Sequence, residues 1–142
     1  TYMSHAIACA GALAVLKVIE EDQLLGNVRS QGAKLKQMLE DNFADHINIG
    51  DIRGRGLFWG LEIVADKDTK EPFPAEYNLA GKIKADILEN GMLSYPSQGC
   101  VDGIRGDHIL LAPPYTITDD ELVIIIETVK KCLNNQLDQL KS

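Results

Sequence analysis

A chain of 142 residues is long enough for one domain with a sizeable core and too short for two comfortable ones. Its apolar share of 45% and charged share of 25% are typical of a globular protein. The net charge is −7 and the acidic residues are spread along the chain, so no basic face favours nucleic acid or an anionic membrane as a partner. The longest apolar run, from Ala6 to Leu16, is too short for a membrane span of roughly 20 residues.

Two helices are predicted at the start of the chain. The first runs from about Ser4 to Glu20 and is rich in alanine, so a neighbouring element could approach it closely. Its larger apolar residues, which would fill the interface, are Ile7, Leu13, Leu16 and Ile19. The second is expected from about Asp22 to Phe43, with apolar residues at helical spacing. Gly26 and Gly32 weaken the prediction that this second helix is continuous.

A change of period then indicates strands. From Leu57 to Val64 apolar residues alternate, so that Leu57, Trp59, Leu61 and Ile63 share one face. Residues 47–53 are the expected partner strand, and Gly54 and Gly56 relax the backbone between the two.

In the second half of the chain the expected order is helix, two strands and helix. A third helix is predicted from about Ala75 to Glu89, and short strands are expected over residues 92–95 and 108–112. Thr118 and Glu121 form a capping box in front of a long final helix. The predicted order is therefore ααββαββα, an α+β domain with a small, mostly antiparallel sheet and flanking helices, occupying residues 1–142.

No self-contained active site follows from the residues themselves. His5, His46 and His108 lie far apart, without the spacing of metal ligands. Cys9, Cys100 and Cys132 are an odd number at wide spacing, which fits neither a disulfide framework nor a zinc site. Without a secretory leader pattern, the expected compartment is a reducing cytoplasm. No catalytic residue and no metal ligand is predicted within the chain.

Two segments are candidates for binding. Residues 1–4 precede the first helix, where a hydroxyl and unpaired backbone N–H groups could hold a phosphate; alternatively Thr1 or Ser4 only caps the helix. The loop over residues 100–108 carries Arg105, a fork-shaped donor suited to a carboxylate. The alternative is a surface turn in which Arg105 pairs with Asp102 or Asp107.

Three blocks, taken in order, resemble the class III aminotransferases, which use pyridoxal phosphate. The blocks are TYMSHAIACA at residues 1–10, RGRGLFWGLE at residues 53–62 and GDHILLAPP at residues 106–114, followed by the helix start TDDEL at residues 118–122. Ala6 stands where the family usually has proline. The resemblance spans the chain, and its second block is most similar to ω-amino acid:pyruvate-type enzymes.

The resemblance implies the C-terminal small domain of such an enzyme, with the fold described above. In the family, the threonine matching Thr1 donates to the cofactor phosphate, and an arginine matching Arg105 binds the substrate carboxylate in some members. The family enzymes are homodimers that move an amino group from an amine or ω-amino acid to a keto acid such as pyruvate. Their Schiff-base lysine lies in a large domain upstream, which also holds most of the pyridoxal phosphate.

The chain begins at Thr1 without an initiator methionine, so we expect it to be part of a longer polypeptide and, by itself, inactive. Amino donor and keto acid would be the partners of the full-length enzyme, without nucleic acid or membrane. The alternative hypothesis is a non-catalytic α+β module that binds a ligand or dimerises. The apolar first helix would suit dimerisation, whereas the ordered set of blocks favours the aminotransferase.

Overall fold

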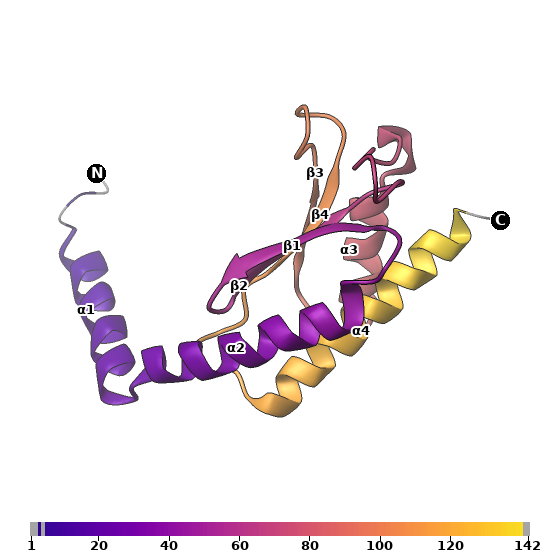
Figure 1. Ribbon diagram of the computed structural model, residues 1–142. Helices are drawn as coiled ribbons and strands as arrows, with labels where there is room; N and C mark the ends of the chain where they lie inside the picture. Colours follow the sequence, from indigo (N-terminus) through magenta and orange to yellow (C-terminus); the bar gives the residue numbers. More distant parts are fainter. Residues whose placement is uncertain (1–2, 4, 141–142) are drawn as a thin grey trace.

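The computed structural model describes residue 3 and residues 5–140 (Figure 1). The helices are α1 (Ala6–Glu21), α2 (Leu24–Phe43), α3 (Leu79–Glu89) and α4 (Asp119–Gln139), and the strands are β1 (Ile49–Arg55), β2 (Phe58–Ile63), β3 (Tyr95–Gln98) and β4 (Asp107–Leu111). A 3-10 turn, Ala75–Tyr77, precedes α3. The predicted order and the α+β fold are confirmed.

The four strands form one antiparallel sheet in the order β1-β2-β4-β3. Burial along β2 alternates as the sequence predicts, because Trp59, Leu61 and Ile63 face the core while Phe58 is exposed. The register places Leu61 between Ile52 of β1 and Ile109 of β4. One face of the sheet is therefore apolar across its central strands.

Helices α2, α3 and α4 cover this apolar face, and the core lies between them and the sheet (Figure 1). Apolar side chains at helical spacing supply the helix side of the core. The fully buried ones are Leu35, Leu39, Phe43, Leu79, Ile83, Leu122, Val129 and Leu133.

Gly32 does not interrupt α2, contrary to what its composition suggests. A Cβ atom added at Gly32 would lie 2.5 Å from the carbonyl oxygen of Gly56. The glycine is needed because the helix and the β1–β2 turn touch there through their backbones. Packing against the turn outweighs the weak helix propensity of glycine, about 1 kcal/mol relative to alanine.

Several predicted boundaries differ from the structure. The strand expected over residues 47–53 is β1 (Ile49–Arg55), so Gly54 lies within the strand and not between the two strands. The third helix begins at Leu79 instead of Ala75, because Asn78 takes a left-handed conformation (φ 47°) after the 3-10 turn. Strand β3 begins at Tyr95, where the predicted strand ends. Its position is set by pairing with β4, since Tyr95 lies opposite Leu110 and Gln98 opposite Asp107. Local sequence carries no trace of that long-range register.

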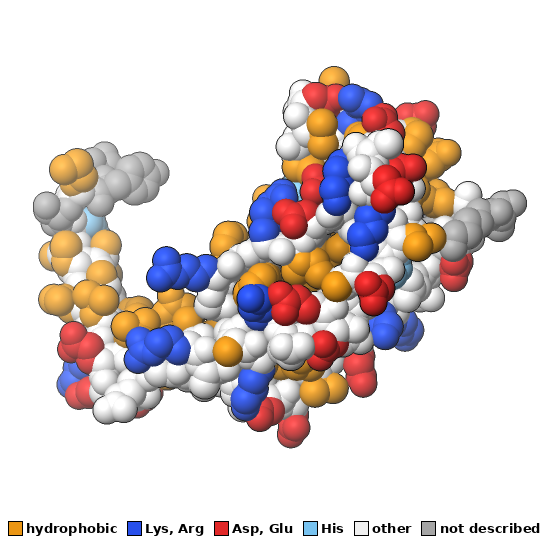
Figure 2. All heavy atoms as spheres, viewed as in Figure 1, with side chains coloured by type: hydrophobic (Ala, Val, Ile, Leu, Met, Phe, Trp, Pro, Cys, Tyr) orange, Lys and Arg blue, Asp and Glu red, His pale blue; other side chains and the backbone are white. Residues whose placement is uncertain are grey.

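Helix α1 buries none of its residues within the described chain, so its predicted interface has no partner there. The helix projects from the body, and hydrophobic side chains cover it (Figure 2). Leu13 and Leu16 are 67% and 56% exposed. A groove of about 590 Å³ lies between α1 and the segment before α4. Its lining is apolar except for Thr116 and consists of Ala14, Val15, Val18, Ile19, Leu24, Pro114, Tyr115 and Thr116.

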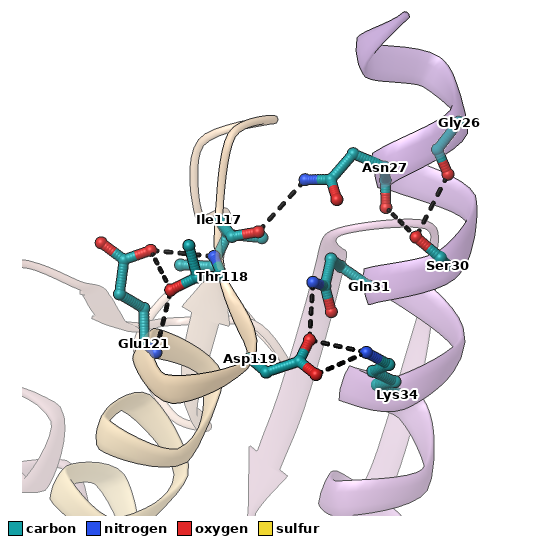
Figure 3. A network of polar contacts seen from close by, with 9 residues as sticks. All are labelled: Gly26, Asn27, Ser30, Gln31, Lys34, Ile117, Thr118, Asp119 and Glu121. Carbon is teal, nitrogen blue, oxygen red and sulfur yellow. Dashed lines mark hydrogen bonds and ion pairs between the residues drawn. The ribbon is translucent and has the colours of Figure 1, made fainter.

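Polar contacts tie α2 to the start of α4 (Figure 3). The Asn27 amide donates to the carbonyl oxygens of Tyr115 and Ile117 at 2.6 and 3.1 Å. One turn further along α2, Gln31 and Lys34 both donate to the Asp119 carboxylate. These contacts hold the Asp119 pKa below its usual range, with the Lys34 bond as the largest cause.

The predicted capping box is present at the same place. Thr118 accepts from the Glu121 backbone N–H, and the Glu121 carboxylate accepts from the Thr118 backbone N–H (Figure 3). The capping box determines the residue at which α4 begins. The contacts from α2 determine the position of that helix end relative to α2. Together they position the segment from Pro113 to Ile117.

Replacing Asn27 by alanine is expected to lower the free energy of unfolding by about 1–3 kcal/mol, because two carbonyl groups lose their donor. Urea denaturation measures the loss. Ser30→Ala is the matched control. Among the described residues the Ser30 hydroxyl donates only to carbonyl oxygens of its own helix, those of Gly26 and Asn27, so the substitution should cost less than about 0.5 kcal/mol. Equal effects of the two substitutions would contradict the role given to Asn27.

Candidate functional site

The first candidate, Thr1, lies outside the described residues, as does Ser4. Helix α1 begins at Ala6, with His5 at the capping position and no side-chain hydrogen bond from that residue to the helix. The role of Thr1 toward a phosphate stays a prediction.

The second candidate lies in the loop that joins β3 to β4. The backbone N–H groups of Gly99 and Cys100 both donate to the carbonyl oxygen of Gly106, which closes the loop at its base. Gly106 has φ 95°, and a Cβ atom there would lie 2.7 Å from the Cys100 Sγ. The turn therefore needs glycine at this position for both conformation and space.

Asp102 organises the inside of this loop. Its Oδ1 accepts from the backbone N–H groups of Ile104 and Arg105, and its Oδ2 accepts from the Arg105 Nε at 2.8 Å. These bonds, the Arg105 backbone N–H first among them, lower the pKa of Asp102 from 3.8 to about 2. The carboxylate thus stays ionised and accepts the hydrogen bonds that hold the turn together.

Arg105 itself pairs with two carboxylates. Besides Asp102, its Nη1 lies 3.1 Å from the Glu71 Oε1 on the loop after β2. The pairing with Asp102 is one of the two that the sequence suggests, and the pairing with Glu71 is not visible in the sequence because the residues are 34 positions apart. A guanidinium has five N–H donors, so these two bonds leave room for a further carboxylate.

Asp107, the other suggested partner of Arg105, has a different role. It is fully buried at the start of β4, and its Oδ1 accepts from the Ala80 backbone N–H at 3.0 Å, in the first turn of α3. Its Oδ2 has no hydrogen-bond partner among the described residues. Burial raises the pKa of this carboxyl, and the Ala80 bond opposes that shift only in part.

The described residues offer little else for chemistry. Within residues 3 and 5–140, no group of three His, Cys, Asp or Glu side chains is placed to hold a metal ion. Over the same stretch of chain, no helix is long and apolar enough to cross a bilayer. The histidines stay apart: His46 bonds to Asn134 beside α4, whereas His108 lies on β4.

Comparison with known proteins identifies the family. The class-III aminotransferase family matches residues 1–133. An uncharacterized aminotransferase of Schizosaccharomyces pombe is 45% identical over 140 residues, which are 99% of this chain and 30% of that protein. Gamma aminobutyrate transaminase 2 of Solanum lycopersicum is 34% identical over 100% of this chain and 30% of that protein. The chain spans about 30% of the length of these relatives.

Solved structures agree with the sequence relatives. An (S)-enantioselective ω-transaminase from Thermomicrobium roseum has the same fold with a TM-score of 0.83 and 34% identity, over 94% of this chain and 28% of that one. A transaminase obtained by ancestral reconstruction gives a TM-score of 0.84. The chain therefore belongs to the class III aminotransferase family.

The Asp102 carboxylate should titrate with a midpoint near pH 2 in a carboxyl NMR experiment, below the ordinary 3.8. Because the folded-state pKa of Asp102 is lowered, the stabilisation that its carboxylate gives the loop is complete above about pH 4. This stabilisation is lost as the pH falls toward 2. Arg105→Gln should raise the midpoint, since it removes the side-chain donor. A midpoint at 3.8 or higher in the unsubstituted chain would contradict the described loop.

Proposed function

We propose that this chain is the small domain of a pyridoxal phosphate-dependent aminotransferase that moves an amino group from an amine or ω-amino acid to a keto acid such as pyruvate. In the complete homodimeric enzyme, Thr1 donates to the cofactor phosphate and Arg105 binds the substrate carboxylate. The observation that carries the proposal is the match of nearly the whole chain to about 28% of a solved ω-transaminase.

Pyridoxal phosphate needs a lysine for its Schiff base, and the described lysines do not fit that task. A lysine that forms a Schiff base is normally desolvated, which lowers its pKa and frees its lone pair. All the described lysines except Lys67 are exposed. Lys67 is half-buried and donates to the carbonyl oxygens of Ala44 and His46 at the end of α2. This exposure supports the proposal that the Schiff-base lysine belongs to another part of the complete enzyme.

Arg105 is suited to its proposed role by position and by charge. It is held on a closed loop by Asp102, and that pairing raises the pKa of its guanidinium. The guanidinium is also partly exposed, so a substrate carboxylate can reach its remaining donors. Binding a carboxylate in place of Glu71 would keep the guanidinium neutralised.

A chimera tests the proposed function directly. The chain replaces the matched segment of the Thermomicrobium roseum ω-transaminase, and amino transfer from an amine to pyruvate is measured. The chimera should be active. Thr1→Ala should weaken the affinity for pyridoxal phosphate about 10-fold, and Arg105→Gln should raise the KM for the keto acid about 10-fold, because each removes a charge-assisted hydrogen bond.

Arg29→Gln, an exposed substitution on α2, is the control and should leave both constants unchanged. A folded chimera that holds the cofactor yet transfers no amino group would overturn the proposed function. An unchanged KM in Arg105→Gln would overturn the role of that residue alone.

The isolated chain should not form a specific adduct with the cofactor. After incubation with pyridoxal phosphate and reduction with borohydride, mass spectrometry should find only substoichiometric labelling scattered over several lysines. The physical reason is that solvated lysines are mostly protonated at neutral pH. One stoichiometric adduct on a single lysine would show that the chain anchors the cofactor after all.

A further inference from the structure

The loop that carries Arg105 begins and ends at two residues whose side chains both bond to another part of the chain. Gln98 and Asp107 lie opposite each other as the pair of the β3–β4 hairpin next to the loop. The Gln98 Nε2 donates to the Ala75 carbonyl oxygen at 3.1 Å. The Asp107 Oδ1 accepts from the Ala80 backbone N–H at 3.0 Å. Both bonds therefore join the base of the loop to the start of α3, the helix that lies beside the hairpin (Figure 1).

Asp107 supplies a cap that α3 lacks locally. The first backbone N–H groups of a helix have no acceptor within the helix. Asn78 stands at the capping position of α3, but its backbone is left-handed (φ 47°) and its side chain makes no capping hydrogen bond. The acceptor for Ala80 is instead a fully buried carboxyl group 27 residues further along the chain. The start of α3 and the base of the loop thus hold each other in place.

The same contacts determine where Glu71 lies, the second carboxylate beside Arg105. Glu71 stands shortly before Ala75, and Pro72 and Pro74 fix the backbone φ at two of the positions between them. Placing Ala75 against the base of the loop therefore places Glu71 as well. The loop then lies where the guanidinium meets that carboxylate, at 3.1 Å.

The ion pair between Arg105 and Glu71 does not hold the loop by itself. The two side chains are 45% and 64% exposed, and ion pairs in water contribute little to stability. Asp102 accepts hydrogen bonds from residues inside the loop, so it shapes the turn without fixing where the turn lies. The two bonds at the base involve side chains that are buried or half-buried, and these bonds are the fixed points of the loop.

We propose that Asp107, assisted by Gln98, is the positioning residue that determines where Arg105 meets the substrate carboxylate. In this role Asp107 acts through the loop, without contact with the substrate. The proposal rests on the role given to Arg105 in the proposed function. Burial disfavours a negative charge on Asp107 and raises the pKa of its carboxyl, so the acceptor oxygen is what α3 needs. An amide oxygen accepts the same bond, which makes Asp107→Asn the variant that separates hydrogen bonding from charge.

NMR of the chain tests the placement of the loop without cofactor or catalysis. In the unsubstituted chain, nuclear Overhauser effects should join the Arg105 and Glu71 side chains. Asp107→Ala should abolish these effects and speed hydrogen exchange of the Ala80 amide about 10-fold, because the cap is lost. Asp107→Asn should preserve both. The pKa of Asp102 should stay at about 2 in each variant, since the bonds inside its turn are intact.

The chimera with the Thermomicrobium roseum enzyme tests the consequence for substrate binding. Asp107→Ala should raise the KM for the keto acid about 5-fold, less than Arg105→Gln does, and leave kcat within about 2-fold. A substitution that only destabilises the fold would instead lower the amount of active enzyme and leave KM unchanged. Asp107→Asn should keep the original KM. In the Arg105→Gln background Asp107→Ala should raise KM no further, because a positioning residue acts through the residue that it positions.

Gln31→Ala is the matched control. Gln31 is also buried, joins two elements through one hydrogen bond, at 2.7 Å to Asp119, and has an oxygen without a partner among the described residues. Its bond ties α2 to α4, away from the loop. Gln31→Ala should lower the stability of the domain and leave both the KM and the Overhauser effects between Arg105 and Glu71 unchanged.

Gln98→Ala, at a half-buried position, serves as the second variant if Asp107→Ala does not fold, and it should change both measurements in the same direction. The proposal is overturned if Asp107→Ala leaves the Overhauser effects in place, if it raises KM further in the Arg105→Gln background, or if Gln31→Ala raises KM as much. An inactive chimera would count against the proposed function, whereas the NMR measurements would still decide whether Asp107 places the loop.

Discussion

One-sided burial of the sheet is the constraint on which the rest of this domain depends. Trp59, Leu61 and Ile63 can leave water only if helices cover their face, and burying each such side chain contributes about 1.5–3 kcal/mol. All three packed helices are therefore on that side. The opposite face is left to short side chains, charges and a few exposed rings, and it is available for contacts that the domain does not make with itself.

The packing of α2 shows how this constraint reaches the polar segments. Gly32 brings α2 against the β1–β2 turn, and the same helix then presents Asn27 and Lys34 to the start of α4. A helix fixed at both contacts has little freedom to slide. The segment from Pro113 to Ile117 is held in place by this arrangement although it has no regular structure of its own.

Local patterns predicted the parts of the fold that local forces determine. The alternation along β2 and the Thr118–Glu121 capping box both depend on residues within one strand or one turn, and both are confirmed. Strand β3 was misplaced because its register is set by β4, and the interruption at Asn78 was missed because a left-handed asparagine leaves no periodic trace. Long-range pairing decides the position of β3, and a single backbone conformation decides the start of α3.

The same division holds for the candidate site. The sequence indicated Arg105 and its partner Asp102, three residues apart, but not Glu71, which only the fold brings near.

The buried carboxyl of Asp107 has a consequence for how the domain exchanges protons with its surroundings. Asp102, Asp119 and Glu121 have lowered pKa values, so folding releases protons from them in mild acid and their support is lost as the pH falls. Asp107 has a raised pKa, so folding draws a proton onto it, and its contribution is complete below its ordinary 3.8 and lost as the pH rises through the folded value. Asp107 thus opposes the other three, and it makes the stability of the domain less sensitive to acidification than the carboxyl groups with lowered pKa values alone would make it.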